Sequence, residues 1–300
     1  MIPAESIRYF NRYSGRIETE QVYGDAFLRW AYESRPGRLA LRTLVKRAAF
    51  SRLYGWLMNT ARSVDKIEPF LEKYQLDATE FARAVASYDS FNEFFFRALQ
   101  LGARPVDLDP ESAVFPADAR HLGFHDMSQI EGVFVKGQTF DLAALLKDRA
   151  LAERYARGTL VLSRLCPVDY HRFHFPICGV PGKPRVIKGP LFSVNPIALR
   201  RRLSYLWENK RSVTEVRSEC FGTVVCLEIG ATNVGSIEQS FTPDRPVAKG
   251  EQKGLFRFGG SSTITLFEPG RLCLANDLLE QTLQGRELYA RMGDRMGQRA

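Results

Sequence analysis

The chain has 300 residues, of which 45% are hydrophobic and 25% charged, and this composition excludes a largely disordered protein. Its five cysteines lack CxxC spacing, which predicts inert core thiols in reducing surroundings. The start of the chain lacks the basic and apolar segments of a secretory signal. No apolar run is long enough to span a bilayer, so we expect neither a signal peptide nor a transmembrane helix.

The net charge of +8 points to an acidic partner, and part of this charge is concentrated near the N-terminus. Residues 35–52 contain no Asp or Glu, and their apolar residues recur at helical spacing on a face apart from the basic one. The basic residues are Arg35, Arg38, Arg42, Lys46, Arg47 and Arg52. The pattern predicts a basic amphipathic helix that binds an anionic membrane surface. The alternative is a core-packing helix with a solvated basic face; no motif indicates nucleic-acid binding.

The pattern is helical from about residue 20 to residue 100, with helix starts predicted at Ser63 and Asp77, and it changes after Pro105. Short apolar runs broken by Gly and Pro then predict strands at 133–135, 159–162, 223–229 and 262–267. Helices are predicted near 141–156 and 197–208, and a terminal helix over 276–292. We therefore expect an α+β protein in which an N-terminal helical, membrane-associating region, 1–104, packs on a mainly β catalytic domain, 105–300.

A Gly-Gly-Ser-Ser-Thr segment, 259–263, lies between two apolar runs that have the character of strands. The Ser261 hydroxyl could attack the carbonyl of Gly260 and convert the amide to an ester; elimination and hydrolysis would then leave a pyruvoyl group. Glycine suits the position before the serine because it has no Cβ and tolerates unusual backbone angles. The alternative is an ordinary Gly-Ser turn.

A serine nucleophile needs a base, usually a histidine that is oriented by a carboxylate. His171 and His174 lie in a segment framed by Pro167 and Pro176, which favours extended chain over helix. Extended residues three apart point to opposite faces, so these histidines are expected to have different roles rather than to form an HxxH metal site. Asp118 follows an apolar run and is the acidic candidate.

Seven motifs occur in the order found in phosphatidylserine decarboxylases, and the chain resembles that family from about residue 88 to about residue 270. The motifs are FNEFF at 91–95, RPVD at 104–107, PAD at 116–118, YHRFHFP at 170–176, LFSVN at 191–195, IGATNVGSI at 229–237 and FGGSST at 258–263. Several separated motifs in one order are far more specific than any single motif. No P-loop or GxGxxG motif is present, in agreement with a cofactor that the protein makes itself.

The resemblance implies that Asp118, His174 and Ser261 form the processing triad and that the chain cuts itself between Gly260 and Ser261. The larger subunit would be 1–260 and the smaller 261–300, with a covalent pyruvoyl group at its start, and the two would stay together. His171 would act as acid or base in decarboxylation. Sheets in a barrel-like sandwich, with the cleavage site in a β-hairpin, are also implied.

By the same resemblance, the substrate would be phosphatidylserine, which the enzyme would convert to phosphatidylethanolamine and CO2. The substrate amine would form a Schiff base with the pyruvoyl group, which takes the electron-sink role that pyridoxal phosphate has elsewhere. No metal or nucleotide would be required. A basic N-terminal helix favours a lipid substrate and a peripheral location on the cytoplasmic side of a membrane.

Two departures and two alternatives accompany this interpretation. Ala119 stands where the family commonly has glycine, and Gly-Gly-Ser-Ser replaces the more frequent Leu-Gly-Ser-Thr, so that Ser262 also becomes a possible nucleophile. One alternative is a metal-dependent enzyme whose ligands are the four histidines, His121, His125, His171 and His174. The other is an unprocessed relative that binds membranes or partners; both alternatives predict an uncut chain.

Overall fold

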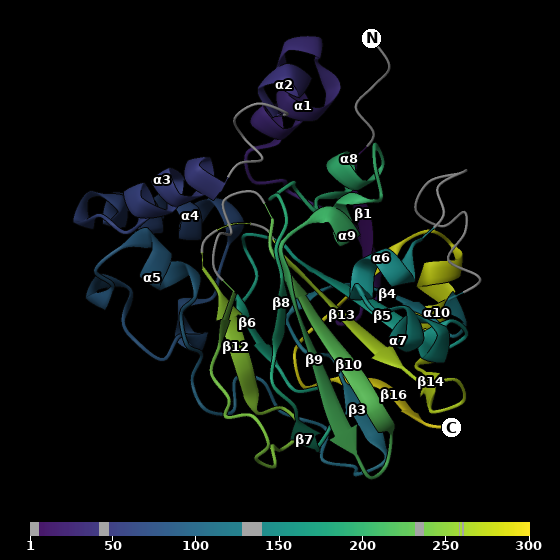
Figure 1. The fold of residues 1–300 in the computed structure, drawn as a ribbon. Helices are drawn as coiled ribbons and strands as arrows, with labels where there is room; N and C mark the ends of the chain where they lie inside the picture. Colours follow the sequence, from purple (N-terminus) through teal and green to yellow (C-terminus); the bar gives the residue numbers. More distant parts are fainter. Residues whose placement is uncertain (1–5, 42–47, 128–139, 232–236, 258, 260) are drawn as a thin grey trace.

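The computed structural model describes residues 6–41, 48–127, 140–231, 237–257, 259 and 261–300. In this part of the chain, helices from the N-terminal third lie along one side of three β-sheets (Figure 1). This arrangement confirms the α+β class. The predicted strand at 133–135 lies outside the described residues.

The largest sheet has ten strands in the order β2-β1-β15-β4-β5-β13-β10-β9-β7, and β8 also pairs with β9. The bounds are β1 Arg8–Asn11, β2 Arg16–Thr19, β4 Ala119–Phe124, β5 Thr159–Leu165, β7 Val180–Pro181, β8 Arg185–Ile187, β9 Arg211–Ser218, β10 Gly222–Ile229, β13 Ser261–Phe267 and β15 Glu287–Ala290. The order of these described strands is open, with β2 at one edge and β7 and β8 at the other, so they do not form a closed barrel.

Two three-stranded sheets complete the described β structure. One has the order β11 (Ile237–Gln239), β12 (Gln252–Phe256) and β6 (Arg172–His174), and the other has the order β14 (Leu272–Leu274), β16 (Arg295–Arg299) and β3 (Ser112–Val114). Successive strands β12 and β13 therefore belong to different sheets. The expected β-hairpin at the cleavage site is wrong, because β13 pairs with β5 and β10 rather than with β12.

The N-terminal helices contribute to two cores. They are α1 Asp25–Glu33, α2 Arg35–Ala40, α3 Ala48–Met58, α4 Ile67–Tyr74 and α5 Phe91–Phe95, with 3-10 turns at Ala61–Lys66, Ala78–Glu80 and Val85–Ser87. The helices α3, α4 and α5 surround an aromatic core, whereas α1 packs its buried residues into the core of the large sheet. Phe70, Phe91 and Phe94 pack edge to face in the aromatic core. The Asp77 side chain caps its turn, as predicted, by accepting from the Thr79 backbone N–H at 2.9 Å.

The predicted basic helix over 35–52 corresponds to α2 and the start of α3, and 42–47 between them lie outside the described residues. Ser34 begins α2 because its hydroxyl accepts from the Gly37 N–H at 2.9 Å and Pro36 suits the first turn. The predicted helical region, 1–104, also contains the strands β1 and β2, and β1 pairs parallel with β15 from the C-terminal part of the chain. The boundary at residue 104 stays a prediction.

Three predicted helices are shorter than expected. The 141–156 segment forms α6 (Leu142–Leu146) and α7 (Arg149–Tyr155), because Lys147 has a φ of 50° and Asp148 caps the second helix. The 197–208 segment likewise divides into α8 (Pro196–Leu199) and α9 (Tyr205–Glu208). The terminal helix α10 runs only over Asn276–Leu283, because the chain then joins the large sheet as β15.

A buried ion pair joins the large sheet to the β6-β11-β12 sheet. The Lys253 ammonium on β12 lies 2.8 Å from the Glu228 carboxylate on β10, and both side chains are at most 2% exposed. Lys253 also donates to Thr214 and Gln239. The two sheets on either side of the predicted cleavage position are therefore fixed to each other by a charged contact that water does not screen.

We expect Lys253→Met to lower the free energy of unfolding by about 3 to 5 kcal/mol, because the Glu228 carboxylate would stay buried without its cation. Urea unfolding followed by circular dichroism measures this change. Adding Glu228→Gln in the same chain should recover much of the loss, since the stranded charge is then removed. Equal stabilities of Lys253→Met and the unaltered protein would show that the pair contributes nothing.

Candidate active site

Ser261 is the first residue of β13, a strand in the interior of the large sheet whose seven residues are all buried. It pairs with Leu165 on β5, and Leu165 packs in one cluster with Ala119, Phe173 and Phe256. Among the described residues, the Ser261 Oγ has no hydrogen-bond partner. A buried hydroxyl without a partner is costly, and the hydroxyls of Ser262 and Thr263 also lack a described partner, so this feature marks the start of β13 rather than Ser261 alone.

The alternation of a β-strand places neighbouring side chains on opposite faces, which separates Ser261 from Ser262. Ser262 pairs with Arg164 on one side and Ile229 on the other, and Ile229 belongs to the core cluster on the opposite face from Leu165. Ser261 therefore shares its face with the cluster that contains Phe173 of the histidine-bearing strand β6. This geometry favours Ser261 over Ser262 as the nucleophile.

Gly259 precedes the candidate cleavage position by one residue and has a φ of 128°. Side chains with a Cβ rarely adopt this conformation, so glycine is required there. Gly260 itself lies outside the described residues. The Gly-Gly pair recognised in the sequence thus includes at least one glycine whose backbone no other residue type would reproduce without strain.

His171 is a histidine whose pKa is affected by the backbone of Gly259. Its Nδ1 is 2.9 Å from the Asp169 carbonyl, which can only accept, so Nδ1 carries the proton and Nε2 is left as the basic nitrogen. No described atom forms a hydrogen bond with that Nε2 by geometric criteria. Burial lowers the pKa of His171 to about 3, and the nearby backbone of Gly259 opposes this shift. The imidazole is therefore neutral at physiological pH.

His174 is held in the same tautomer by a different carbonyl. Its Nδ1 donates to the Gly250 carbonyl at 2.9 Å, and its Nε2 lies 3.3 Å from the Tyr170 hydroxyl. Burial lowers the pKa of His174, whereas the nearby charge of Asp118 raises it. Asp118 thus acts on His174 through the electric field rather than through a hydrogen bond that an orienting carboxylate would make.

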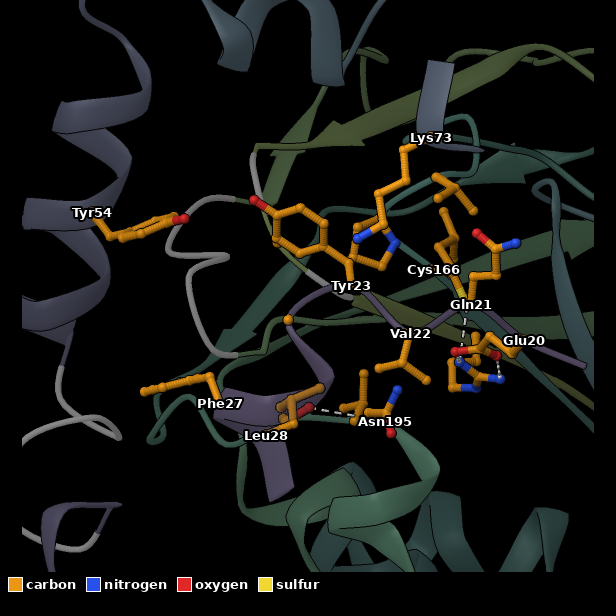
Figure 2. Close-up of a pocket in the computed structure, with 18 residues that line it drawn as sticks. Glu20, Gln21, Val22, Tyr23, Phe27, Leu28, Tyr54, Lys73, Cys166 and Asn195 are labelled. Carbon is orange, nitrogen blue, oxygen red and sulfur yellow. Dashed lines mark hydrogen bonds and ion pairs between the residues drawn. The ribbon is translucent and has the colours of Figure 1, made fainter. Parts of the chain in front are cut away.

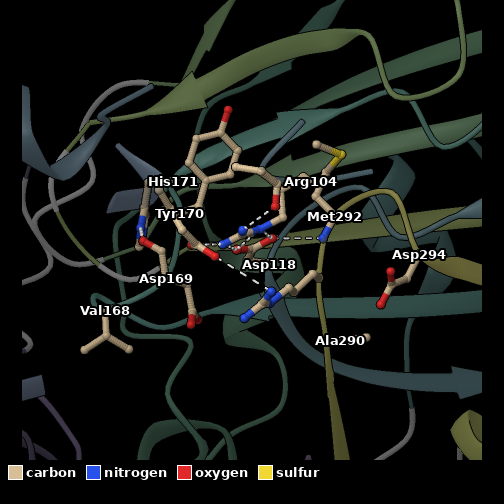
Figure 3. Close-up of polar contacts among 12 residues, drawn as sticks. Arg104, Asp118, Val168, Asp169, Tyr170, His171, Ala290, Met292 and Asp294 are labelled. Carbon is tan, nitrogen blue, oxygen red and sulfur yellow. Dashed lines mark hydrogen bonds and ion pairs between the residues drawn. The ribbon is translucent and has the colours of Figure 1, made fainter. Parts of the chain in front are cut away.

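Asp118 is buried between an arginine and a backbone amide (Figure 3). The Arg104 guanidinium contacts both of its oxygens at 2.7 to 3.0 Å, and the Met292 N–H donates to Oδ1 at 2.9 Å. Arg104 also binds Glu80 at 2.8 Å. The position of the carboxylate is therefore fixed by hydrogen bonds from Arg104 and from the backbone.

In the described residues, no hydrogen bond joins Asp118, His174 and Ser261 to one another. The structure does bring together His171 and Gly259, and it couples Asp118 to His174 electrostatically. Sequence reasoning did not assign roles to Arg104 and Tyr170, which hold Asp118 and His174. Both stand inside the recognised motifs, so their motif positions were the available signal.

An apolar cavity of about 450 Å³ opens beside Gly259 (Figure 2). Its lining includes Cys166 and the 193–195 segment from the β domain, together with apolar side chains of the N-terminal region. Those side chains are Val22, Tyr23, Phe27, Leu28 and Tyr54. The cavity therefore extends from the candidate cleavage position to the N-terminal helices, and its lining suits hydrocarbon.

The four histidines do not form the alternative metal site. His121 is buried between Ser163 and the Ala290 carbonyl, and burial lowers its pKa to about 3, whereas His125 is exposed. In the described portion of the chain, no three His, Cys, Asp or Glu side chains are grouped so as to hold a metal ion. The Ser261 hydroxyl and the His171 Nε2 both lack a described partner, so the residues present are compatible with a group made from Ser261.

Within the described residues, none of the helices combines the length and the apolar character needed to cross a bilayer.

Comparison with known proteins relates the chain to one family over most of its length. The family model for phosphatidylserine decarboxylase matches residues 91–298. A phosphatidylserine decarboxylase proenzyme from Chlamydia muridarum is 43% identical over 296 residues, covering 99% of this chain and 98% of the relative. Proenzymes of the same name from Desulfitobacterium hafniense and Fusobacterium nucleatum are 40% and 39% identical, each over 98% of both chains.

The protein is an enzyme of the carboxy-lyase class. The chain belongs to the phosphatidylserine decarboxylase family, as its motifs predicted.

Proposed function

We propose that this protein converts phosphatidylserine to phosphatidylethanolamine and CO2 with a pyruvoyl group that it makes from Ser261. The observation that carries the proposal is near full-length similarity to proteins named phosphatidylserine decarboxylase proenzyme. The word proenzyme supports self-processing. The unpartnered Ser261 hydroxyl, two residues after a glycine with a positive φ, supports cleavage at the start of β13.

In the processing step, the Ser261 Oγ attacks the Gly260 carbonyl carbon while a base takes the hydroxyl proton. The C–N bond breaks and an ester forms, so the Ser261 nitrogen becomes a free amine. Elimination of the Gly260 carboxylate leaves dehydroalanine, an enamine, at 261; water then hydrolyses its imine tautomer and releases ammonia. The products are a 1–260 subunit with an ordinary carboxyl terminus and a 261–300 subunit that begins with a ketone.

The histidines are proposed to divide the proton transfers. His174, oriented by the Gly250 carbonyl and under the field of Asp118, serves processing with Ser261. His171 first takes a proton at Nε2 from the substrate ammonium group, which becomes the attacking amine, and then delivers this proton to the carbon from which CO2 leaves; the Nε2 is buried near Gly259. A pyruvoyl group supplies the electron sink by condensing with the substrate amine and accepting the electron pair that decarboxylation releases.

The N-terminal region, 1–104, is proposed to bring the site to the lipid. Exposed apolar side chains gather on α1 and α3, next to the Phe27 and Tyr54 lining of the apolar cavity. Phe27 and Trp30 are 43% exposed, Leu53 is 58% and Trp56 is 62% exposed. These residues and the basic charge of 35–52 support peripheral binding to an anionic membrane on the cytoplasmic side, with the acyl chains entering the cavity.

We expect Trp56→Ala to weaken binding to vesicles that contain phosphatidylserine by about 5- to 30-fold, because roughly 1 to 2 kcal/mol of apolar transfer energy is lost. Co-sedimentation with vesicles measures this partition. Leu283→Ala is the matched control, since Leu283 is 84% exposed but lies on α10, away from the cavity. Equal losses in both variants would overturn the assignment of this surface.

The direct test of the function is CO2 release from carboxyl-labelled phosphatidylserine in mixed micelles, with free serine as the comparison substrate. Release from the lipid that is blocked by a carbonyl reagent such as hydroxylamine supports a pyruvoyl enzyme. A protein that stays uncut and releases no CO2 would favour the alternative of an unprocessed relative that binds membranes or partners.

A further inference from the structure

A second cavity, of about 630 Å³, lies next to the apolar one and shares Gln21 and Val168 with it. Its lining is polar and includes Asp118 and Tyr170, which Figure 3 shows together with Arg104. The two cavities thus form adjoining apolar and polar compartments. The proposed reaction uses Asp118 but assigns no ligand to the polar space itself.

Arg97 in this cavity differs from the other buried arginines. Arg120 and Arg164 are each paired with carboxylates, and Arg211 donates to three backbone carbonyls at 2.6 to 2.8 Å. Each of these three guanidinium groups thus has strong hydrogen-bond acceptors in place of the water that it loses on burial. Arg97 is only 4% exposed and has no such acceptors among the described residues.

The contacts of Arg97 are weak for a buried cation. Its guanidinium reaches the Phe94 and Val168 carbonyls only at 3.5 and 3.4 Å, and its Nε has no partner in the described structure. The rings of Phe81 and Phe94 lie 4.8 and 4.9 Å from it. Burial lowers the pKa of Arg97 to about 10, while nearby charges only partly offset this effect. A buried guanidinium with unused donors is a site for an anion.

Two further donors line the same cavity. The Tyr74 hydroxyl and the Arg291 Nε are both buried, and neither has a hydrogen-bond partner in the part of the chain that is described. With Arg97, the described lining therefore contains unused donors from α4, from the segment after α5 and from the segment after β15. A fourth, the Arg120 Nε on β4, lies 3.5 Å from the Glu20 carboxylate. A ligand with several acceptor oxygens could engage all of these.

The buried and partly buried carboxylates in the lining are bound mainly by other groups, although Glu80 also lies 3.7 Å from the Arg291 Nη1. Asp118 and Glu80 bind Arg104, and Asp169 binds Arg120. The fourth buried or partly buried carboxylate, Glu18, accepts from Tyr9, Asn11 and Ser14. These pairs neutralise Arg104 and Arg120, and among the described arginines of the lining Arg97 has no ion pair.

We infer that Arg97, with Tyr74 and Arg291, binds the phosphate of the phospholipid headgroup, an inference that rests on the proposed function. The phosphate persists from substrate to product, so a cation can bind it without opposing the reaction. A cation on the substrate carboxylate would stabilise the very group that must lose its charge as CO2 leaves. The adjoining apolar cavity then receives the rest of the lipid.

The first experiment measures binding without catalysis. The uncut Ser261→Ala chain is titrated calorimetrically with glycerophosphoserine, and the titration is repeated after adding Arg97→Gln. We expect binding to weaken about tenfold or more, as the loss of a charge-assisted hydrogen bond implies. Unchanged binding in Arg97→Gln would overturn the inference. Because the chain is uncut, this result is independent of whether the proposed decarboxylation occurs.

Three controls test whether the effect depends on the charge of Arg97, whether each variant is folded, and whether the site binds a headgroup rather than any phosphate. Arg97→Lys should retain part of the binding, whereas Arg154→Gln, which removes an arginine outside the cavity, should not alter it. Thermal melts identify any variant that fails to fold, and for such a variant the Tyr74→Phe chain replaces it, with a smaller loss of binding expected. Inorganic phosphate that binds as tightly as glycerophosphoserine would overturn assignment of the site to a headgroup.

In the processed enzyme, Arg97→Gln should raise the KM for phosphatidylserine about tenfold or more and change kcat much less, because the lost contact is the same before and during the reaction. Cleavage of the chain should proceed normally, since it precedes lipid binding. A fall in kcat at constant KM would overturn the headgroup assignment.

Discussion

Replacing Ser261 with alanine leaves the protein as one chain of 34.1 kDa, whereas the unaltered protein yields two fragments that meet at Gly260 and residue 261. The expected effect is complete, because no other atom in the proposed step can form the ester. Intact mass under denaturing conditions measures it, and the smaller fragment should have the mass of a pyruvoyl N-terminus. The variant should also release no CO2 from phosphatidylserine.

Ser262→Ala is the matched control, because it removes the adjacent hydroxyl from the opposite face of β13. This variant should be cut at the same bond. An uncut Ser262→Ala chain together with a cut Ser261→Ala chain would exchange the roles of the two serines. A single full-length chain for the unaltered protein would contradict the pyruvoyl mechanism altogether.

The second large effect is expected from the histidines. His171→Gln should yield two fragments but lower kcat for decarboxylation by about a hundredfold to ten-thousandfold, the range for loss of a general acid or base. Glutamine preserves a donor toward the Asp169 carbonyl and removes the basic Nε2. His174→Gln should instead impair the cut itself, so that little active enzyme forms.

These outcomes are measured on one set of samples, with intact mass for the cut and CO2 release per titrated carbonyl group for the chemistry. Titrating the carbonyl corrects the rate for incomplete processing. An uncut His171→Gln chain would assign processing to the histidine beside Gly259, reversing the proposed division. Full decarboxylation per carbonyl in His171→Gln would remove this residue from catalysis.

Much of the fold was predictable where local pattern and packing agree. The apolar run at 262–267 predicts β13 because strand propensity and burial point the same way, and the Asp77 start follows from side-chain capping. The 141–156 helix was predicted as one because its composition is helical throughout. The helix divides because Lys147 adopts a positive φ, and a lysine in the sequence does not predict this conformation.

The candidate site was predictable as a set of residues but not as an arrangement. Motif order identified Asp118, His174 and Ser261, yet the partner of each side chain depends on segments far away in sequence. The Gly250 carbonyl that orients His174 and the Arg104 that holds Asp118 are examples. The joining of β1 to β15 is of the same kind, because long-range pairing leaves little trace in either short segment.

The position of β13 affects how the enzyme folds before the proposed cleavage and how it could refold afterwards. This strand belongs to the proposed 261–300 subunit, but it lies between β5 and β10 of the larger subunit, each paired with it along five or more residues. The sheet must therefore be completed while the chain is still continuous, and folding is unimolecular. After the cut, refolding from the completely unfolded state would require two separate chains to associate. The 261–300 chain would lack most of the strands that pair with β13. Under the proposed self-cleavage, the enzyme folds once as a single chain, and the lifetime of its folded state afterwards depends on how slowly it unfolds.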